Sequence, residues 1–204
     1  MSPENVSAMV LAGGYSRRMG RNKAELPLGG KTLLEHQTEK LRKLGIRDVM
    51  LSGYEGQLEA CRTVADVFPH RGPLSGIHAC LLAAEHPACL VLSVDMPLVP
   101  ADTLWALIEA HQREGDPGVT VLRHGERMEP LLAVYDRELC PAAEAILRTE
   151  KTAIMRLLDA CQVRMVDYAG DEFLLTNCNT PEEFDRIAAY YETNREENLK
   201  TRKR

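Results

Sequence analysis

Residues 9–23 read Met-Val-Leu-Ala-Gly-Gly-Tyr-Ser-Arg-Arg-Met-Gly-Arg-Asn-Lys. Val6 to Leu11 is apolar and predicts a buried strand, which Ala12-Gly13-Gly14 ends. Glycines at a strand end let backbone N–H groups approach a phosphate and let the chain turn with positive φ. The cations Arg17, Arg18, Arg21 and Lys23 follow closely. The stretch therefore predicts a polyphosphate-binding loop. A Gly-Gly turn with a solvated basic run would show the same residues, and the spacing of a Walker A loop is absent.

The overall composition is that of one globular domain. The chain has 204 residues, of which 45% are hydrophobic and 27% charged, and its formal net charge is −5. A single core accommodates this length, and the acidic balance argues against a general nucleic-acid binder. The six cysteines show neither zinc spacing nor a Cys-x-x-Cys pair, which favours reduced thiols. With no apolar run of membrane-spanning length and no signal peptide in Met1 to Ser7, we expect a cytoplasmic protein without a membrane partner.

Strands and helices alternate in the first half of the chain. Thr32 and Glu35 predict a capping box for a helix that ends at Leu44, and the next strand spans 48–52. Together with the first strand this is a β–α–β unit, which requires a parallel pair with a right-handed crossover. Residues 88–94 are almost continuously apolar, as expected for a central strand covered on both faces.

The second half breaks this alternation with a hairpin of strands at 118–123 and 129–135, which predicts an antiparallel addition. Further helices are expected at 57–61, 74–85, 138–149 and 152–160, and further strands at 63–68, 163–168 and 172–176. Pro181 begins a last helix with an apolar stripe of Phe184, Ile187, Ala188 and Tyr191. The expected fold is a single-domain, Rossmann-like three-layer α/β sandwich over residues 1–193. Residues 194–204 are expected as a frayed polar tail.

Two acidic residues and a second glycine-rich turn are further candidates for the site. Asp95 follows the strand of residues 88–94, and ligands bind at the carboxyl ends of strands in open α/β sheets. An aspartate there often only caps a helix, but Pro100 or Asp102 already serves the next one. Asp66 near the strand of 63–68 could equally be a turn former. The turn Arg71-Gly72-Pro73-Leu74-Ser75-Gly76-Ile77 opens a helix whose N-terminus could bind an anion, or could simply start the helix.

Residues 11–23 resemble the signature loop of nucleotidyltransferases that transfer an NMP from an NTP. Within that superfamily they most resemble the molybdenum cofactor guanylyltransferases. Residues 71–77 are similar to the Gly-Pro-Leu-x-Gly stretch of that family, and Asn-Cys-Asn-Thr-Pro at 177–181 to its Asn-x-Asn-Thr-Pro stretch. The segment 124–130, His-Gly-Glu-Arg-Met-Glu-Pro, resembles the family segment near the acceptor side of the cleft. The resemblance covers roughly residues 6–190.

The resemblance implies a role for each matching residue. Arg18 and Lys23 would hold the triphosphate, and Asp95 would ligate Mg²⁺, so these three are the expected catalytic residues. The expected nucleotide-binding residues are Leu11, Ala12, Gly13, Gly14, Lys23, Asp66 and Asp95. Asn177 and Asn179 are expected on the acceptor side. Lys151 lies in a cationic link that could meet a second anionic ligand there or be a solvated connector. Ser52 falls where some members carry an asparagine.

The implied reaction is transfer of GMP from GTP to the terminal phosphate of molybdenum-bearing molybdopterin. A phosphate acceptor is already ionised at neutral pH, so charge neutralisation and in-line positioning would supply the rate. CTP with molybdopterin, or an NTP with a sugar phosphate, is a close alternative. A non-catalytic nucleotide or cofactor carrier is a different one. Implied partners are GTP, molybdopterin, and other cofactor-biosynthesis proteins or molybdoenzyme chaperones.

Overall fold

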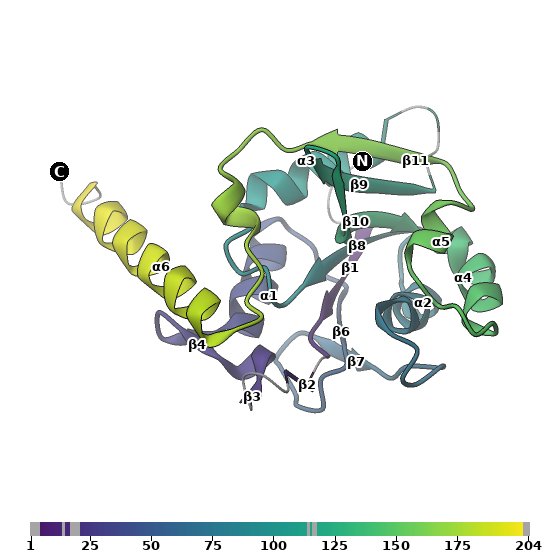
Figure 1. The fold of residues 1–204 in the computed structure, drawn as a ribbon, viewed down its shortest axis with the longest axis horizontal. Coiled ribbons are helices and arrows are strands. Elements are labelled where there is room, and N and C mark those ends of the chain that lie inside the picture. Colours follow the sequence, from purple (N-terminus) through teal and green to yellow (C-terminus); the bar gives the residue numbers. More distant parts are fainter. Residues whose placement is uncertain (1–4, 14, 17–20, 114, 116–117, 202–204) are drawn as a thin grey trace.

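The computed structural model of the chain describes residues 5–13, 15–16, 21–113, 115 and 118–201. Its centre is a seven-stranded sheet in the order β11–β9–β10–β8–β1–β6–β7 (Figure 1). The strands of this sheet are β1 (Val6–Leu11), β6 (Val49–Ser52), β7 (Arg62–Val64), β8 (Ala88–Ser93), β9 (Val119–His124), β10 (Arg127–Asp136) and β11 (Val163–Asp167). Two small pairs lie outside it: β2 (Tyr15–Ser16) with β3 (Arg21–Asn22), and β4 (Pro27–Leu28) with β5 (Lys31–Thr32).

The sheet is parallel except at β10. β1 pairs in parallel with β6 on one side and with β8 on the other, and β9 pairs in parallel with β11. β10 runs antiparallel to both β8 and β9. The mostly parallel sheet with an antiparallel hairpin is therefore confirmed. The carboxyl ends of β1, β6 and β8 lie together at one edge of the sheet, because Leu11 is level with Ser52 and Ser93.

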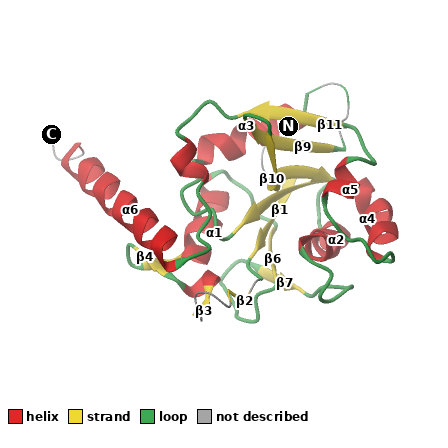
Figure 2. Ribbon diagram, in the orientation of Figure 1, coloured by secondary structure: helices red, strands yellow, loops and turns green. Residues whose placement is uncertain are grey.

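Helices cover both faces of the sheet, which completes the three layers that the sequence predicts (Figure 2). One face carries α1 (Leu33–Lys43), α3 (Ala101–His111) and α6 (Pro181–Thr201), and the other carries α2 (Pro73–Ala83), α4 (Cys140–Leu147) and α5 (Met155–Leu158). Successive residues of β1 alternate between the two cores: Val10 packs with the α1 layer, whereas Met9 and Leu11 pack with the α2 layer.

Local hydrogen bonds fix α1 where the sequence predicts it. Thr32 Oγ1 accepts from the backbone N–H of Glu35 at 3.2 Å, and Glu35 Oε2 accepts from the backbone N–H of Thr32 at 2.6 Å. This capping box satisfies two donors at the start of the helix and sets its rotation. The apolar stripe of α6 is also confirmed. Ile187 is buried in the core of the α1 layer, and Phe184, Ala188 and Tyr191 pack against it.

Several predicted elements differ in the structure. Residues 172–176 are not a strand: Glu172–Leu175 form the 3₁₀ helix η4, because Asp171 Oδ1 accepts from Phe173 N–H at 2.9 Å and caps a turn. The short helix predicted at 57–61 is a turn, with the backbone N–H of Cys61 donating to Leu58 O. Two further 3₁₀ turns, η2 (Lys23–Glu25) and η3 (Arg137–Leu139), precede α1 and α4.

The second half also differs in the lengths of its helices. The helix predicted at 152–160 shrinks to α5, because the carbonyl of Lys151 accepts hydrogen bonds from Thr149 Oγ1 and Arg156 Nη1 and the chain there is not helical. α6 continues to Thr201, through most of the segment expected as a frayed tail, and the domain limit at residue 193 stays a prediction. In the described ranges, no helix is long and apolar enough to cross a membrane.

Candidate functional site

The ends of β1 and β6 meet through two glycines. Gly53 has φ +71°, and a Cβ on it would lie 2.8 Å from Gly13 N and closer still to Gly13 Cα. The backbone N–H groups of Ala12 and Gly13 both donate to Ser52 O, at 2.9 and 3.1 Å. This differs from the expectation that amides of this stretch face the nucleotide: those of Ala12 and Gly13 are already used to hold β6. The close approach of the two strand ends instead shapes the floor of a cavity.

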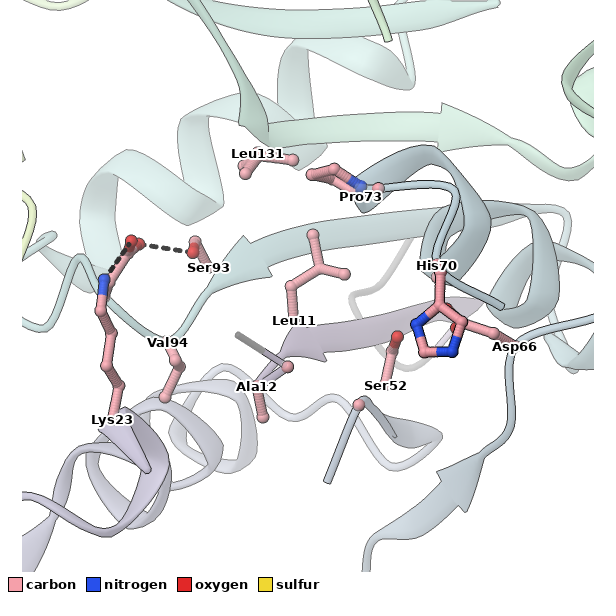
Figure 3. A pocket seen from close by; sticks show the side chains of 15 residues that line it. Leu11, Ala12, Lys23, Ser52, Asp66, His70, Pro73, Ser93, Val94 and Leu131 are labelled. Carbon is pink, nitrogen blue, oxygen red and sulfur yellow. Dashed lines mark hydrogen bonds and ion pairs between the residues drawn. The ribbon is translucent and has the colours of Figure 1, made fainter. Parts of the chain in front are cut away.

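A cavity of about 570 Å³ opens at this edge of the sheet (Figure 3). It is lined by six of the residues singled out from the sequence as nucleotide-binding: Leu11, Ala12, Gly13, Lys23, Asp66 and Asp95. Lys23 lies at one end of it and Asp66 at the other, with Leu11 and Ala12 between them (Figure 3). Asp95 is at the Lys23 end, since it accepts a hydrogen bond from Lys23. Residues from four separate parts of the sequence therefore meet around one hollow. Gly14 and Arg18 lie outside the described residues.

Lys23 and Asp95 form the charged end of the cavity, and Asn179 contacts Lys23 there. Lys23 Nζ donates to Asn179 Oδ1 at 2.6 Å and to Asp95 Oδ2 at 3.4 Å. The other carboxylate oxygen, Asp95 Oδ1, accepts from Ser93 Oγ at 2.5 Å. The side chains of Lys23 and Asp95 are only 13% and 21% exposed, so solvent screens this pair less than a surface ion pair. Both Asp95 oxygens are oriented by neighbours, which fixes where the carboxylate points.

Cys178 lies beside this end, but it is not a nucleophile. Burial raises the pKa of its thiol to about 11, although Lys23 nearby acts in the opposite direction. The thiolate is the reactive form, so Cys178 stays inert at neutral pH. Its backbone does contribute: the N–H of Cys178 donates to the carbonyl of Asp95 at 2.7 Å and ties the 177–181 stretch to the end of β8.

The opposite end of the cavity combines Asp66 with residues that the sequence reasoning did not single out. His70 lines it with φ +63°, a left-handed backbone that is uncommon for a residue with a side chain. Gly53 and Leu131 also line the cavity without having been predicted. The signal for Gly53 was available, because it follows the strand of 48–52 as Gly13 follows the first strand. Nothing in the local sequence pointed to Leu131, which reaches the site from β10.

The N-terminus of α2 borders the same cavity. Gly72, with φ +78°, is its N-cap residue, makes no side-chain capping bond, and lines the cavity together with Pro73. Its first turn offers few free donors, because Pro73 has no N–H and the N–H of Ser75 donates to Gly72 O at 3.0 Å. Gly76 has a more specific reason than a helix start: a Cβ there would lie 2.9 Å from Leu11 Cδ2 and nearer still to Ser52 Oγ. Gly76 therefore lets α2 approach the ends of β1 and β6.

A second cavity of about 390 Å³ adjoins the first. Its lining residues are His124, Arg127, Glu129, Glu172, Leu175, Thr176, Asn177, Asn179 and Glu183. Burial raises the pKa of Glu129, and nearby Asp95 adds to this rise, whereas its ion pair with Arg127 at 2.7 Å opposes it. The two cavities meet at the hydrogen bond between Lys23 and Asn179. Asn177 and Asn179 therefore lie together, next to the segment 124–130.

Lys151 is not brought to this place. It is exposed in the connection between α4 and α5, on the α2 side of the sheet, and it lines neither cavity. The link that contains it is tied to the chain just before α2, since Arg71 donates to the carbonyls of Leu147 and Thr149. Its expected role toward an anionic ligand stays a prediction.

The residues at the charged end fit a hard divalent cation. Asp95 Oδ2 and Asn179 Oδ1 both approach one positive group, the ammonium of Lys23. Carboxylate and amide oxygens are the ligands that Mg²⁺ accepts, and it usually takes one or two protein groups together with substrate phosphates. Within the part of the chain that the structure describes, no cluster of three or more His, Cys, Asp and Glu side chains could hold a metal unaided. The site therefore suits an ion that arrives with a nucleotide.

The chain is similar to one group of known proteins along most of its length. The profile of the MobA-like NTP transferase domain matches residues 8–165. A protein of Carboxydothermus hydrogenoformans, named probable molybdenum cofactor guanylyltransferase, is 32% identical over 192 residues, which cover 90% of this chain and 95% of that one. A protein of Opitutus terrae with the same name is 37% identical over 196 residues, covering 89% and 96%. The solved structure of molybdopterin-guanine dinucleotide biosynthesis protein A from Archaeoglobus fulgidus has a TM-score of 0.77 at 25% identity and covers 92% of this chain and 99% of its own.

Proposed function

We propose that this chain, which belongs to the MobA-like NTP transferase family and is a nucleotidyltransferase, transfers GMP from GTP to the terminal phosphate of molybdenum-bearing molybdopterin. The products are pyrophosphate and the guanine dinucleotide form of the cofactor. The observation that carries the proposal is the meeting of two cavities at Lys23, Asp95 and Asn179. A reaction that joins two phosphate-bearing substrates needs such a junction between their binding sites.

In this reaction an acceptor phosphate oxygen attacks the α-phosphorus of GTP. A new P–O bond forms, the bond between the α-phosphorus and the oxygen that bridges it to the β-phosphorus breaks, and pyrophosphate leaves with the electron pair. The acceptor oxygen carries no proton that must be removed, so the site needs no general base. Lys23 neutralises charge on the triphosphate where it builds up on the leaving group, and its own side chain is only 13% exposed.

Asp95 and Asn179 are the residues that would hold Mg²⁺, and Ser93 keeps the Asp95 carboxylate in place. When bound, the ion supplies charge neutralisation on phosphate oxygens. The nucleotide would lie in the larger cavity, with its phosphates toward Lys23 and its base toward Asp66. The acceptor would lie in the smaller cavity, where Asn177 and Arg127 offer donors to a phosphate or a pterin.

GTP is the proposed nucleotide, in preference to CTP, ATP and UTP. Guanine presents two donors, N1–H and N2–H₂, on one edge. The carboxylate of Asp66 at the far end of the cavity can accept them. Adenine lacks the N2 donor and reverses the hydrogen-bond character at positions 1 and 6. Asp66 is exposed in the unliganded protein, and a bound base would cover it. A covered group left unpaired costs about 1–3 kcal/mol, so two mismatches give a preference on the order of a hundredfold.

The test is pyrophosphate release from each of the four NTPs with Mg²⁺, in the presence and absence of molybdopterin that carries molybdenum. We expect release only with GTP and acceptor together. Equal release with CTP or ATP would contradict the guanylyl assignment and leave nucleotidyl transfer standing. Release with a sugar phosphate, but not with molybdopterin, would show that a sugar phosphate is the acceptor. GTP binding without release under any condition would support a non-catalytic carrier.

The proposal extends to the cellular setting. All six cysteines are free thiols, which suits a reducing compartment, and we place the protein in the cytoplasm. Its product is a cofactor that other proteins use. Transfer to cofactor-biosynthesis proteins or to chaperones of molybdenum enzymes is therefore part of the same proposal. Neither nucleic acid nor a membrane is a proposed partner.

A further inference from the structure

One side chain of α1 donates hydrogen bonds to the backbone on both sides of Asp95. The side chain of Gln37 is fully buried, and its Nε2 donates to Ser93 O and to Met96 O, each at 2.9 Å. These carbonyls belong to residues two before and one after Asp95. An amide nitrogen with two hydrogens can satisfy both acceptors at once. Gln37 therefore closes the turn that carries the Asp95 carboxylate.

The amide oxygen of Gln37 shows that the fold uses this side chain as a hydrogen-bond donor. Its Oε1 is buried and has no hydrogen-bond partner among the described residues. A buried acceptor without a partner is costly, and an apolar residue of the same size would avoid that cost. The glutamine is thus placed for its two donors, which only the turn at Asp95 receives.

Lys40 extends the same contact by one helical turn. Residues three apart on a helix lie on one face, and Lys40 Nζ donates to Pro97 O and Val99 O, both at 2.9 Å. Together with the N–H of Cys178, which donates to Asp95 O, these groups satisfy five carbonyls between residues 93 and 99. Ser93 is the last residue of β8, and residues 94–99 are turns and irregular chain, so side chains of α1 supply four of these five hydrogen bonds.

We propose that Gln37, supported by Lys40, is a positioning residue that fixes the Asp95 carboxylate for the divalent cation of the reaction. The inference rests on the proposed function, because it takes Asp95 as the metal ligand. Gln37 touches neither cavity and acts only through the backbone of residues 93–96. Groups that orient a metal ligand commonly change metal affinity by ten- to a hundredfold when they are removed.

The test compares Gln37→Leu with Thr38→Val. Leucine retains the bulk of Gln37 but donates nothing. Thr38 is the matched control: it is 1% exposed on the same helix, and its Oγ1 donates only to Leu34 O and Glu35 O, within its own turn. Both variants lose buried hydrogen bonds, but only one of them loses contact with the Asp95 segment. A third variant, Lys40→Met, removes the supporting pair of hydrogen bonds if Gln37→Leu does not fold.

The measurement is the affinity of Mn²⁺, used as a probe for the metal, in the presence of a GTP analogue that cannot be cleaved. Electron paramagnetic resonance gives this affinity without any turnover. We expect about tenfold weaker Mn²⁺ binding in Gln37→Leu, a smaller loss in Lys40→Met, and less than a twofold change in Thr38→Val. Unchanged affinity in the folded Gln37→Leu protein would overturn the proposal, as would an equal loss in Thr38→Val.

This readout separates the inference from the proposed function. If the wild-type protein transfers no GMP, but Gln37→Leu still weakens Mn²⁺ binding, the positioning role stands and the assigned reaction falls. If the wild-type protein transfers GMP, but Gln37→Leu binds Mn²⁺ as tightly as the wild type, the reaction stands and the positioning role falls.

Discussion

Gly53 offers the sharpest test of the site's architecture, because a glycine has no side chain that could contact a substrate. Its substitution by alanine adds one methyl group between the ends of β6 and β1. That methyl carbon would lie 2.8 Å from Gly13 N and still closer to Gly13 Cα. Neither atom belongs to a flexible side chain, so the strand ends themselves must separate.

Two costs add in Gly53→Ala. The left-handed φ of +71° costs a residue with a Cβ about 1 kcal/mol. Overpacking against backbone costs a further 1–3 kcal/mol, roughly, because well-packed interiors do not absorb an extra methyl freely. The expected loss in the free energy of unfolding is therefore about 3 kcal/mol. Separation of the strand ends also displaces Gly13 and Ala12 on the cavity floor, so GTP should bind more weakly than to the wild-type protein.

The assay is urea unfolding together with equilibrium binding of GTP. Gly45→Ala is the control, because Gly45 has φ +87° but nothing within 4 Å of an added Cβ. It should lose only the backbone cost, about 1 kcal/mol, and should bind GTP as the wild type does. Equal losses of stability in the two variants, or unchanged GTP binding by Gly53→Ala, would refute the idea that the approach of these glycines builds the nucleotide site.

Three further predictions concern charged groups. Asp95→Asn should abolish metal-dependent turnover with little change in Tm, since an amide keeps the shape but lacks the charge that Mg²⁺ prefers; persistent Mg²⁺-dependent activity would exclude Asp95 from the mechanism. Lys23→Ala should lower kcat about a hundredfold or more, and Lys23→Arg should restore little of that loss. A wild-type rate for Lys23→Ala would show that Lys23 takes no part in catalysis. Burial alone would raise the pKa of Asp48, but hydrogen bonds from Glu85 N–H, Ser7 and Arg62 outweigh it and lower that pKa. Asp48→Asn should therefore cost about 2 kcal/mol at pH 7, and this difference from the wild type should vanish as the pH falls below about 4, through the folded-state pKa; a constant difference across acid titration would contradict the assignment.

The sequence predicted those parts of the fold whose cause is local. β1 coincides with its predicted limits because six consecutive residues of Val6–Leu11 are buried on both faces. The capping box of Thr32 and Glu35 formed as expected because its partners lie three residues apart. The same holds for the hairpin of β9 and β10, whose turn and strands are adjacent in the chain.

The differences arise where distant contacts decide. Residues 172–176 have apolar character that suits a strand, but the side chain of Asp171 caps Glu172–Leu175 as a 3₁₀ helix after the edge strand β11. Gly53 and Leu131 reach the cavity only because β6 and β10 flank the β1–β8 pair in the sheet. Gln37 belongs to no sequence motif, and its place on one face of a predicted helix gives no sign of a functional role. Its role depends on two carbonyls, of Ser93 and Met96, that lie 56 and 59 residues further along the chain.

The hydrogen bond from Lys23 to Asn179 connects two residues for which the sequence predicts different roles. The resemblance assigns Lys23 to the triphosphate and Asn179 to the acceptor, yet they lie 2.6 Å apart across 156 residues of chain. An ammonium has three hydrogens, and Asp95 and Asn179 together receive two of them. Counting its partners in the described part of the chain, Lys23 has one donor left for a phosphate unless the oxygens of Asp95 and Asn179 obtain another positive partner. Full engagement of Lys23 with the triphosphate thus depends on how those two oxygens are neutralised, which links phosphate binding, cation binding and the acceptor side at one nitrogen atom.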